Sequence, residues 1–168
     1  MQRIWPILGS LAFFVIAPGT ILVLVPQWIT QFHRQPAFFD ADWLRTVGAA
    51  LIAAGLVPLI HSCAVFAFKG LGTPAPVAPP KHLVVSGFYR YVRNPMYVGL
   101  VLALVGEALF FGNVRLIFWA AAFWLMTHLF VIGYEEPALT EQFGKQYETF
   151  RGNVPRWIPR LTPWASPG

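Results

Sequence analysis

Residues 95–134 read PMYVGLVLALVGEALFFGNVRLIFWAAAFWLMTHLFVIGY, and this stretch decides the fold. Two apolar runs, residues 95–111 and 116–134, are separated only by the four residues GNVR. A helix needs about 20 apolar residues to cross the hydrocarbon core of a bilayer. So short a link between two helices makes them antiparallel neighbours. The stretch therefore predicts a helical hairpin inside a membrane.

Two further apolar runs precede this hairpin, at residues 4–28 and 43–68. The first contains Pro18 followed by Gly19, so we expect a kink or a local break in its helix. A secretory signal peptide would have a shorter apolar run that ends in a small-residue cleavage site, and we set that alternative aside. Hydrophobic residues make up 57% of the chain and charged residues 11%, against about 25% charged in an ordinary soluble domain. The sequence predicts an all-α, multi-pass transmembrane helical bundle of about four membrane helices.

Small residues recur at helical spacing in the second and third runs, at Gly48 and Gly55 and again at Gly99 and Gly106. Helices associate in lipid through close packing, and small side chains let their backbones approach. We therefore expect the second and third helices to touch along these glycines.

Lysine and arginine gather on one side of the predicted bundle. They lie between the second and third helices and after the fourth: Lys69, Lys81, Arg90, Arg93, Lys145, Arg151, Arg156 and Arg160. Cytoplasmic loops carry an excess of these residues, so we expect both termini and the long middle loop in the cytoplasm, with the inner membrane as location if the source is bacterial. The net charge of +5 also favours membrane lipids as partners. No nucleic-acid partner is expected, because the positive residues are dispersed and show no nucleic-acid-binding motif.

Two polar segments flank the hairpin. Residues 81–97 read KHLVVSGFYRYVRNPMY and concentrate Arg90, Arg93, Asn94 and three tyrosines at a membrane boundary. Arginine pairs bidentately with carboxylates and phosphates, so the segment could hold the acidic part of a ligand. Aromatic and basic residues also form interfacial belts that merely anchor a helix, and the residue types alone favour that simpler interpretation.

The second polar segment begins with Glu135 and Glu136 at the end of the fourth run. Two adjacent carboxylates at a membrane exit are costly unless they are hydrated or paired, and a cationic ligand or Arg90 and Arg93 would pair them. Alternatively they are the solvated first turn of a cytoplasmic helix. Residues 137–150 then look amphipathic, and their apolar stripe could lie on the bilayer or cover a pocket. That stripe consists of Leu139, Phe143, Tyr147 and Phe150.

Both segments together resemble the isoprenylcysteine carboxyl methyltransferase family and its broader relatives, which include phospholipid N-methyltransferases. The resemblance rests on an ordered series of short motifs: Leu83-Val84-x-x-Gly87-x-Tyr89, Arg93-x-Pro95-x-Tyr97-x-Gly99, Glu135-Glu136-x-x-Leu139, Phe143-Gly144-x-x-Tyr147 and Val154-Pro155-Arg156 with Pro159. It covers residues 81–159, and we identify none in the first two helices. The chain then divides into an N-terminal transmembrane helical pair (1–68) and a methyltransferase-like core (69–168) with a cofactor loop, the hairpin, and a C-terminal cytoplasmic helix and tail.

The resemblance implies a site for S-adenosylmethionine. The residues at the matching positions are Lys81, His82, Leu83, Val84, Tyr89, Asn94, Pro95, Met96, Tyr97, Glu135 and Glu136. S-adenosylmethionine carries a sulfonium, an ammonium and a carboxylate, which an array of glutamate, arginine, backbone amides and phenols can match. We expect Arg93 and Glu135 to converge on one hollow of the size of a nucleotide.

Three positions depart from the family pattern. Asn94 replaces a histidine, Phe150 replaces a frequent tyrosine, and Val131 stands where the prenylcysteine enzymes place an arginine that contacts the acceptor. The missing arginine argues against a prenylcysteine carboxylate, so we expect a lipid-like or other apolar small molecule that enters sideways from the bilayer.

His128 lies seven residues before Glu135, two helical turns into the membrane. It could act as a general base, and Arg93 is the second catalytic candidate. No metal is implied, because the single Cys63 has no metal-ligand spacing around it. Two rival functions stay open: a membrane-embedded NADPH-dependent reductase, since some sterol reductases share a related helical arrangement, and a non-catalytic membrane scaffold.

Overall fold

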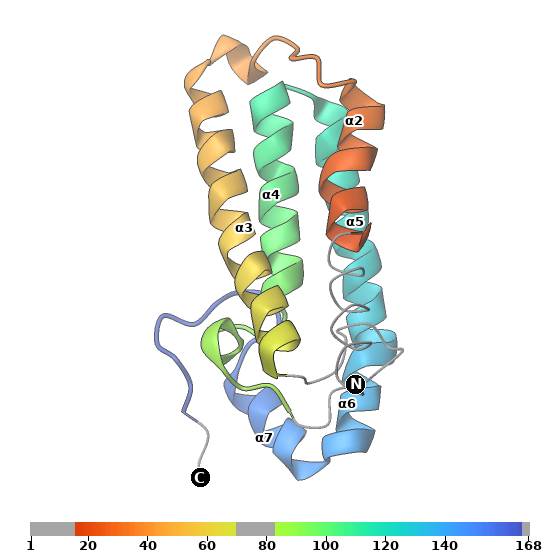
Figure 1. Ribbon diagram of the computed structural model, residues 1–168, viewed down its shortest axis with the longest axis vertical. Helices are drawn as coiled ribbons and strands as arrows, with labels where there is room; N and C mark the ends of the chain where they lie inside the picture. Colours follow the sequence, from red (N-terminus) through yellow and green to blue (C-terminus); the bar gives the residue numbers. More distant parts are fainter. Residues whose placement is uncertain (1–15, 70–82, 166–168) are drawn as a thin grey trace.

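The fold is a bundle of antiparallel helices, and the computed structural model describes residues 16–69 and 83–165. Within these ranges every regular element is helical (Figure 1). The main bundle helices are α2 (Val25–Thr30), α3 (Trp43–Lys69), α4 (Pro95–Phe111) and α5 (Val114–Phe130). The predictions for the second and third helices are confirmed within one residue, because their ends coincide with clear changes of composition.

The first predicted helix is described from Ile16 onward, and residues 4–15 lie outside the described ranges. We expected a kink or a local break at Pro18 and Gly19, and the break does not occur. The helix continues through a π-helical turn, η1 (Thr20–Leu24), into α2. Proline cannot donate a backbone hydrogen bond, and Pro26 is the second residue after this turn. A wider turn is a common way for a helix to absorb such a gap without breaking.

The helices α3 and α4 pack backbone to backbone along the predicted glycines. A Cβ atom placed on Gly48 would lie 2.6 Å from the carbonyl oxygen of Gly106, and one on Gly106 would lie 2.6 Å from that of Gly48. Gly55 and Gly99 approach each other in the same way one level further along. The predicted contact stripe is therefore confirmed, and it fixes α3 against α4.

The predicted hairpin between α4 and α5 is also confirmed. Gly112 ends α4 with a φ of 67°, a left-handed conformation that glycine adopts without strain. Asn113 caps α5, because its side-chain oxygen accepts a hydrogen bond of 2.9 Å from the backbone N–H of Arg115. The inner side of the hairpin packs into the core through Leu100, Leu104, Ala120 and Phe123.

The end of the fourth helix differs from the prediction of one helix at 116–134 and another at 137–150. The helix continues from α5 through a π-helical turn, η4 (Val131–Glu135), into α6 (Glu136–Phe143). Pro137 lies in the first turn of α6, where a missing N–H costs little. The helix ends at Gly144, which has a φ of 51°, and α7 (Lys145–Asn153) follows in a new direction.

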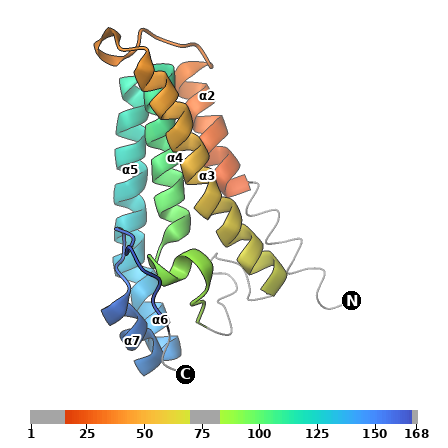
Figure 2. The same cartoon turned by 90° about the vertical axis from the view of Figure 1, so that its left-hand side faces the viewer.

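Two of the described helices are long and apolar enough to cross a membrane, over Trp43–Val65 and Val114–Phe143. Ile16–Thr30 and Pro95–Phe111 are apolar but shorter. An all-helical membrane protein is the result, and the count of four crossings stays a prediction. The end of α3, the start of α4, α6 and α7 all lie at one end of the bundle (Figures 1 and 2).

Candidate active site

An ion-pair cluster joins the two polar segments at this end of the bundle. The Glu136 carboxylate accepts a hydrogen bond of 2.8 Å from Arg93 and two from Arg156, at 2.5 Å from Nε and 2.9 Å from the terminal nitrogen. The side chains of Arg93 and Glu136 are each only 9% exposed. Two arginines thus neutralise one buried carboxylate, and Arg156 does so with the bidentate geometry that guanidinium favours.

Backbone contacts hold the cluster in place. The segment η3 (Gly87–Arg90) leads to Arg93, whose backbone N–H donates to the Pro155 carbonyl at 2.9 Å. Asn94, the residue before α4, donates from its side chain to the Arg156 carbonyl at 3.2 Å. The C-terminal tail is therefore tied across the start of α4, and it carries Arg156 to Glu136.

The apolar stripe of Leu139, Phe143, Tyr147 and Phe150 faces the protein. Tyr147, Phe150 and Val154 form a buried cluster against which Leu83 and Trp164 pack. We expected this stripe either to lie on the bilayer or to cover a pocket. Leu139, Tyr147 and Phe150 line the small cavity at the ion-pair cluster, as expected of a cover. The residues of this stripe lie on two helices, α6 and α7, because Gly144 interrupts the single amphipathic helix that we expected.

The cluster also perturbs the protonation of its neighbours outside the bundle. Desolvation, together with the nearby Glu136 charge, raises the pKa of Tyr147, while a hydrogen bond from Arg93 at 3.3 Å opposes this rise. The hydrogen bond to Glu136 raises the pKa of Arg156. Tyr147 therefore stays a neutral phenol and Arg156 stays charged over the physiological pH range.

Glu135 has a different environment from its neighbour. It lies beside Tyr97, within side-chain hydrogen-bonding range, and its charge reaches Tyr89. Desolvation raises the pKa of Tyr89, so this residue is also a neutral phenol. Among the described residues, Oε2 of Glu135 is buried and has no hydrogen-bond partner, and the same holds for Nε of Arg93. One acceptor and one donor are thus buried and unsatisfied at the same site, which is unusual in a folded protein.

Other predicted cofactor residues lie around this site in varied roles. Pro95 and Met96 form the first turn of α4 and are buried, and Val84 packs with Met96 in the main core. Leu83 packs on the Tyr147 cluster. Lys81 and His82 lie outside the described ranges.

The expected convergence of Arg93 and Glu135 is found, but the space between them is small. Both side chains line one cavity with Glu136 and Tyr147, and its volume is about 20 Å³. This volume holds about one water molecule. The described residues alone do not form the expected hollow of nucleotide size. Residues 70–82, which precede this site in sequence, are outside the described part.

His128 lies in an aromatic cluster of its own. Its Nδ1 accepts a hydrogen bond of 3.0 Å from the indole N–H of Trp157. Its ring stacks on Trp124 at a centroid distance of 5.1 Å. These contacts occupy one ring nitrogen and tie the C-terminal tail to α5. A role for His128 as general base stays a prediction, and no described contact joins it to the ion-pair cluster.

Sequence reasoning did not assign Arg156 and Tyr147 to the site. Both belong to the ordered motifs, so the resemblance itself was the available signal. The tail that carries Arg156 lacks any helical or strand periodicity, so nothing in its pattern indicated that it would return to Glu136.

Comparisons with known proteins point to one family. The sequence profile of the phospholipid methyltransferase family matches residues 43–146. The match begins at the start of α3, so the resemblance extends further toward the N-terminus than the motifs had indicated.

Two characterised relatives have related names. The chain is 36% identical over 80 residues to the protein-S-isoprenylcysteine O-methyltransferase of Schizosaccharomyces pombe, a match that covers 47% of this chain and 34% of the relative. It is 26% identical over 144 residues to protein-S-isoprenylcysteine O-methyltransferase B of Arabidopsis thaliana, covering 83% of this chain and 71% of the relative. The chain thus spans about a third of the first relative. No solved structure gave a significant match.

Proposed function

Because the chain belongs to the phospholipid methyltransferase family, we propose that it is an integral membrane methyltransferase that uses S-adenosylmethionine and methylates a lipid-like or other apolar acceptor. Membrane location is supported by the two long apolar helices and by the family. The observation that carries the proposal is the pair of unsatisfied buried groups, the acceptor on Glu135 and the donor on Arg93.

These two groups fit the charged end of the methyl donor. An amino-acid moiety presents an ammonium and a carboxylate, and charge-assisted hydrogen bonds favour a carboxylate for the first and a guanidinium for the second. Glu135 is the residue that would face the cations, with the phenols of Tyr89 and Tyr97 beside it. Glu136 is already paired with two arginines, so we assign it to positioning Arg93.

When bound, S-adenosylmethionine supplies a methyl group on a sulfonium, which a nucleophile can displace in line. The protein's contribution is to orient the reactants and exclude water, since such a transfer needs little acid or base chemistry. The buried apolar cluster of Tyr147, Phe150 and Val154 would cover the site, because Tyr147 and Phe150 also line its cavity. The tail hydrogen bonds from Arg93 and Asn94 keep this cover in place.

Our proposal for the methyl acceptor rests on the residue at position 131. The named relatives act on isoprenylcysteine, and Val131 stands where the motif comparison places an arginine in such enzymes. Val131 is 1% exposed and lines the small cavity beside Glu135. An apolar side chain at this point offers no partner to a carboxylate, so we propose an acceptor whose reacting end is not a free carboxylate.

Donor binding by a matched pair of variants tests the proposal. We expect wild-type protein in detergent to bind S-adenosylmethionine and to transfer a radioactive methyl group to an extracted membrane lipid. Glu135→Gln should weaken donor binding at least tenfold with little change in thermal stability, because this carboxylate has no ion-pair partner in the fold. Glu148→Gln, an exposed glutamate on α7, is the control and should bind as wild type.

Two results would overturn the proposal. Binding of NADPH without binding of S-adenosylmethionine would indicate the reductase instead. Unchanged methylation products in cells that carry Glu135→Ala would indicate a non-catalytic scaffold.

A further inference from the structure

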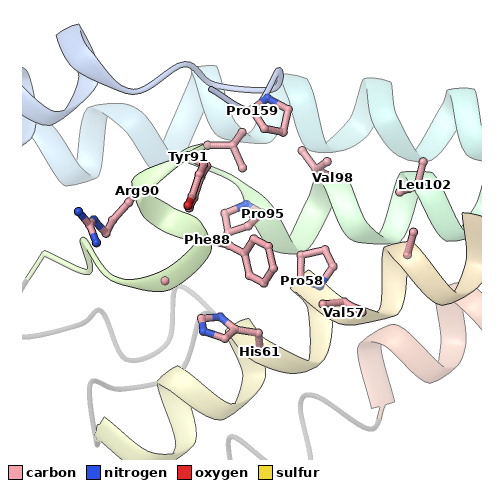
Figure 3. A pocket seen from close by; sticks show the side chains of 13 residues that line it. Val57, Pro58, His61, Phe88, Arg90, Tyr91, Pro95, Val98, Leu102 and Pro159 are labelled. Carbon is pink, nitrogen blue, oxygen red and sulfur yellow. The ribbon is translucent and has the colours of Figure 1, made fainter. Parts of the chain in front are cut away.

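A second hollow, larger than the cavity between Arg93 and Glu135, lies beside η3. It is a groove of about 620 Å³ between α3, η3 and α4, and its lining includes none of Arg93, Glu135 and Glu136 (Figure 3). Binding pockets for small molecules have volumes of about 300–1,000 Å³, so the groove is large enough for a ligand. It is separate from the ion-pair cluster and is not explained by the proposed methyl-donor site.

The groove is amphipathic along its length. In Figure 3 the side chains of Arg90, Tyr91 and His61 lie toward one end, and Val98 and Leu102 lie toward the other. Its lining contains an arginine and a histidine but no aspartate or glutamate. The groove thus offers a basic polar end and an apolar remainder, which suits a molecule with an anionic head and a hydrocarbon tail.

Both basic side chains are held in position and retain binding capacity. Arg90 donates from Nε to the Trp164 carbonyl at 2.7 Å, which fixes the guanidinium at the groove edge while its terminal nitrogens have no described partner. His61 packs edge-on against Phe88 at a centroid distance of 5.0 Å, and its Nδ1 is buried without a hydrogen-bond partner. An unsatisfied buried nitrogen inside an apolar groove calls for a polar partner.

Gly87 makes room for this histidine. A Cβ atom at position 87 would overlap the His61 ring, and Gly87 has a φ of 57°. The backbone of η3 therefore touches the imidazole directly. This close approach holds His61 between η3 and α3, at the wall of the groove.

The polar end of the groove lies at the height expected of a lipid headgroup. The apolar span of α3 covers Trp43–Val65, and His61 is one helical turn from the end of that span. Ala54 and Val57, also in the lining, lie deeper in the span, Ala54 by seven residues or roughly 10 Å along the helix axis. The basic end is thus at the membrane boundary and the apolar end is inside the hydrocarbon region.

We propose that this groove binds an anionic phospholipid from the adjoining leaflet. Its phosphate lies at Arg90 and His61, and one acyl chain follows Val57, Val98 and Leu102 between α3 and α4. Basic pockets between membrane helices on the cytoplasmic side bind anionic headgroups by the same combination of charge and apolar contact. The site requires only that the chain spans a membrane, so it does not depend on the proposed methyl transfer.

Native mass spectrometry of the full chain in detergent tests the charge of the occupant. Phosphatidylglycerol and phosphatidylcholine with identical acyl chains are the probes. We expect wild-type protein to retain phosphatidylglycerol about fivefold more strongly, the contribution of about one basic residue near the surface. Arg90→Gln should abolish this preference, and Arg90→Lys should restore most of it. Lys145→Gln removes an equal charge from an exposed site on α7 and should leave the preference unchanged.

A steric variant tests the location of the chain. Val98→Trp fills the groove and should reduce retention of both lipids, whereas Leu125→Trp, on a lipid-exposed face of α5, should not. The midpoint of thermal unfolding measured on the same samples reports whether each variant is folded. An undiminished phosphatidylglycerol preference in Arg90→Gln would overturn the proposal. So would equal lipid retention by the two tryptophan variants.

Discussion

Glu135 and Glu136 are neighbours in sequence, yet their carboxylates have opposite environments. Glu136 is held by Arg93 and Arg156 in a buried ion-pair cluster. Glu135 has a buried oxygen, Oε2, without a hydrogen-bond partner in the described part of the chain. A paired charge serves the structure, whereas an unpaired one is stable only with a ligand, a proton or a water molecule. The two residues should therefore respond differently to the same substitution.

We predict that Glu136→Gln destabilises the protein by on the order of 3 kcal/mol, because it leaves two arginine charges without their shared partner. The side chains of Arg93 and Glu136 are each 9% exposed, so water screens this loss poorly. Thermal unfolding in detergent measures the effect, with Glu148→Gln as the exposed control. If Glu136→Gln unfolds like wild type and loses only donor binding, Glu136 is a ligand-contacting residue and the structural assignment is wrong.

The residues of this cluster were only partly predictable. Arg93, Glu135 and Glu136 stand in motifs whose residue types already indicate charge pairing at a membrane boundary. The partner of Glu136 could not be read from spacing, because Arg156 lies twenty residues further on in a tail without periodicity. The sequence also could not show that the cavity between Arg93, Glu135 and Glu136 would have a volume of only about 20 Å³.

At the scale of elements, the contact between α3 and α4 was the most predictable feature. Glycines repeated at helical spacing on two apolar runs leave few alternatives to close backbone packing in lipid. The end of the fourth helix was the least predictable. A double glutamate followed by proline is typical of a helix start. The π-helical turn η4 instead precedes Pro137, and the helix continues from α5 into α6 without a break.

We predict that Gly106→Ala destabilises the bundle by about 1–3 kcal/mol, the usual cost of adding volume at a close-packed contact. The added Cβ would lie 2.6 Å from the Gly48 carbonyl oxygen, so α3 and α4 must move apart. Gly133→Ala is the matched control, because a Cβ atom at that position meets nothing within 4 Å. The midpoint of thermal unfolding in detergent reports both variants. Equal midpoints for the two would show that the glycine contact does not hold the helices together.

At the scale of the whole molecule, every feature of the candidate site lies at one end of the bundle. Figures 1 and 2 show η3, α6, α7 and the C-terminal tail together at the end where α3 finishes and α4 begins. The opposite end carries the loop that contains η2 (Phe38–Asp40). Arg45 of α3 donates hydrogen bonds there to the Gln35 carbonyl at 2.7 Å and to the Phe110 carbonyl of α4 at 2.8 Å. Since the lysines and arginines concentrate at the site end, we predict from the positive-inside rule that this end faces the cytoplasm.

Labelling of single cysteines tests this orientation. In a Cys63→Ala background, we expect a membrane-impermeant maleimide to label His33→Cys, in the loop between α2 and η2, on intact cells. Lys145→Cys, exposed at the start of α7, should react only after the membrane is permeabilised. We expect this orientation because the opposite one would require Arg93, Arg156 and their charged neighbours to cross the bilayer, which costs free energy. Labelling of Lys145→Cys on intact cells would place the unpaired carboxylate of Glu135 outside the cell. A cytoplasmic methyl donor could not reach it there, and the proposed reaction would fail with the orientation.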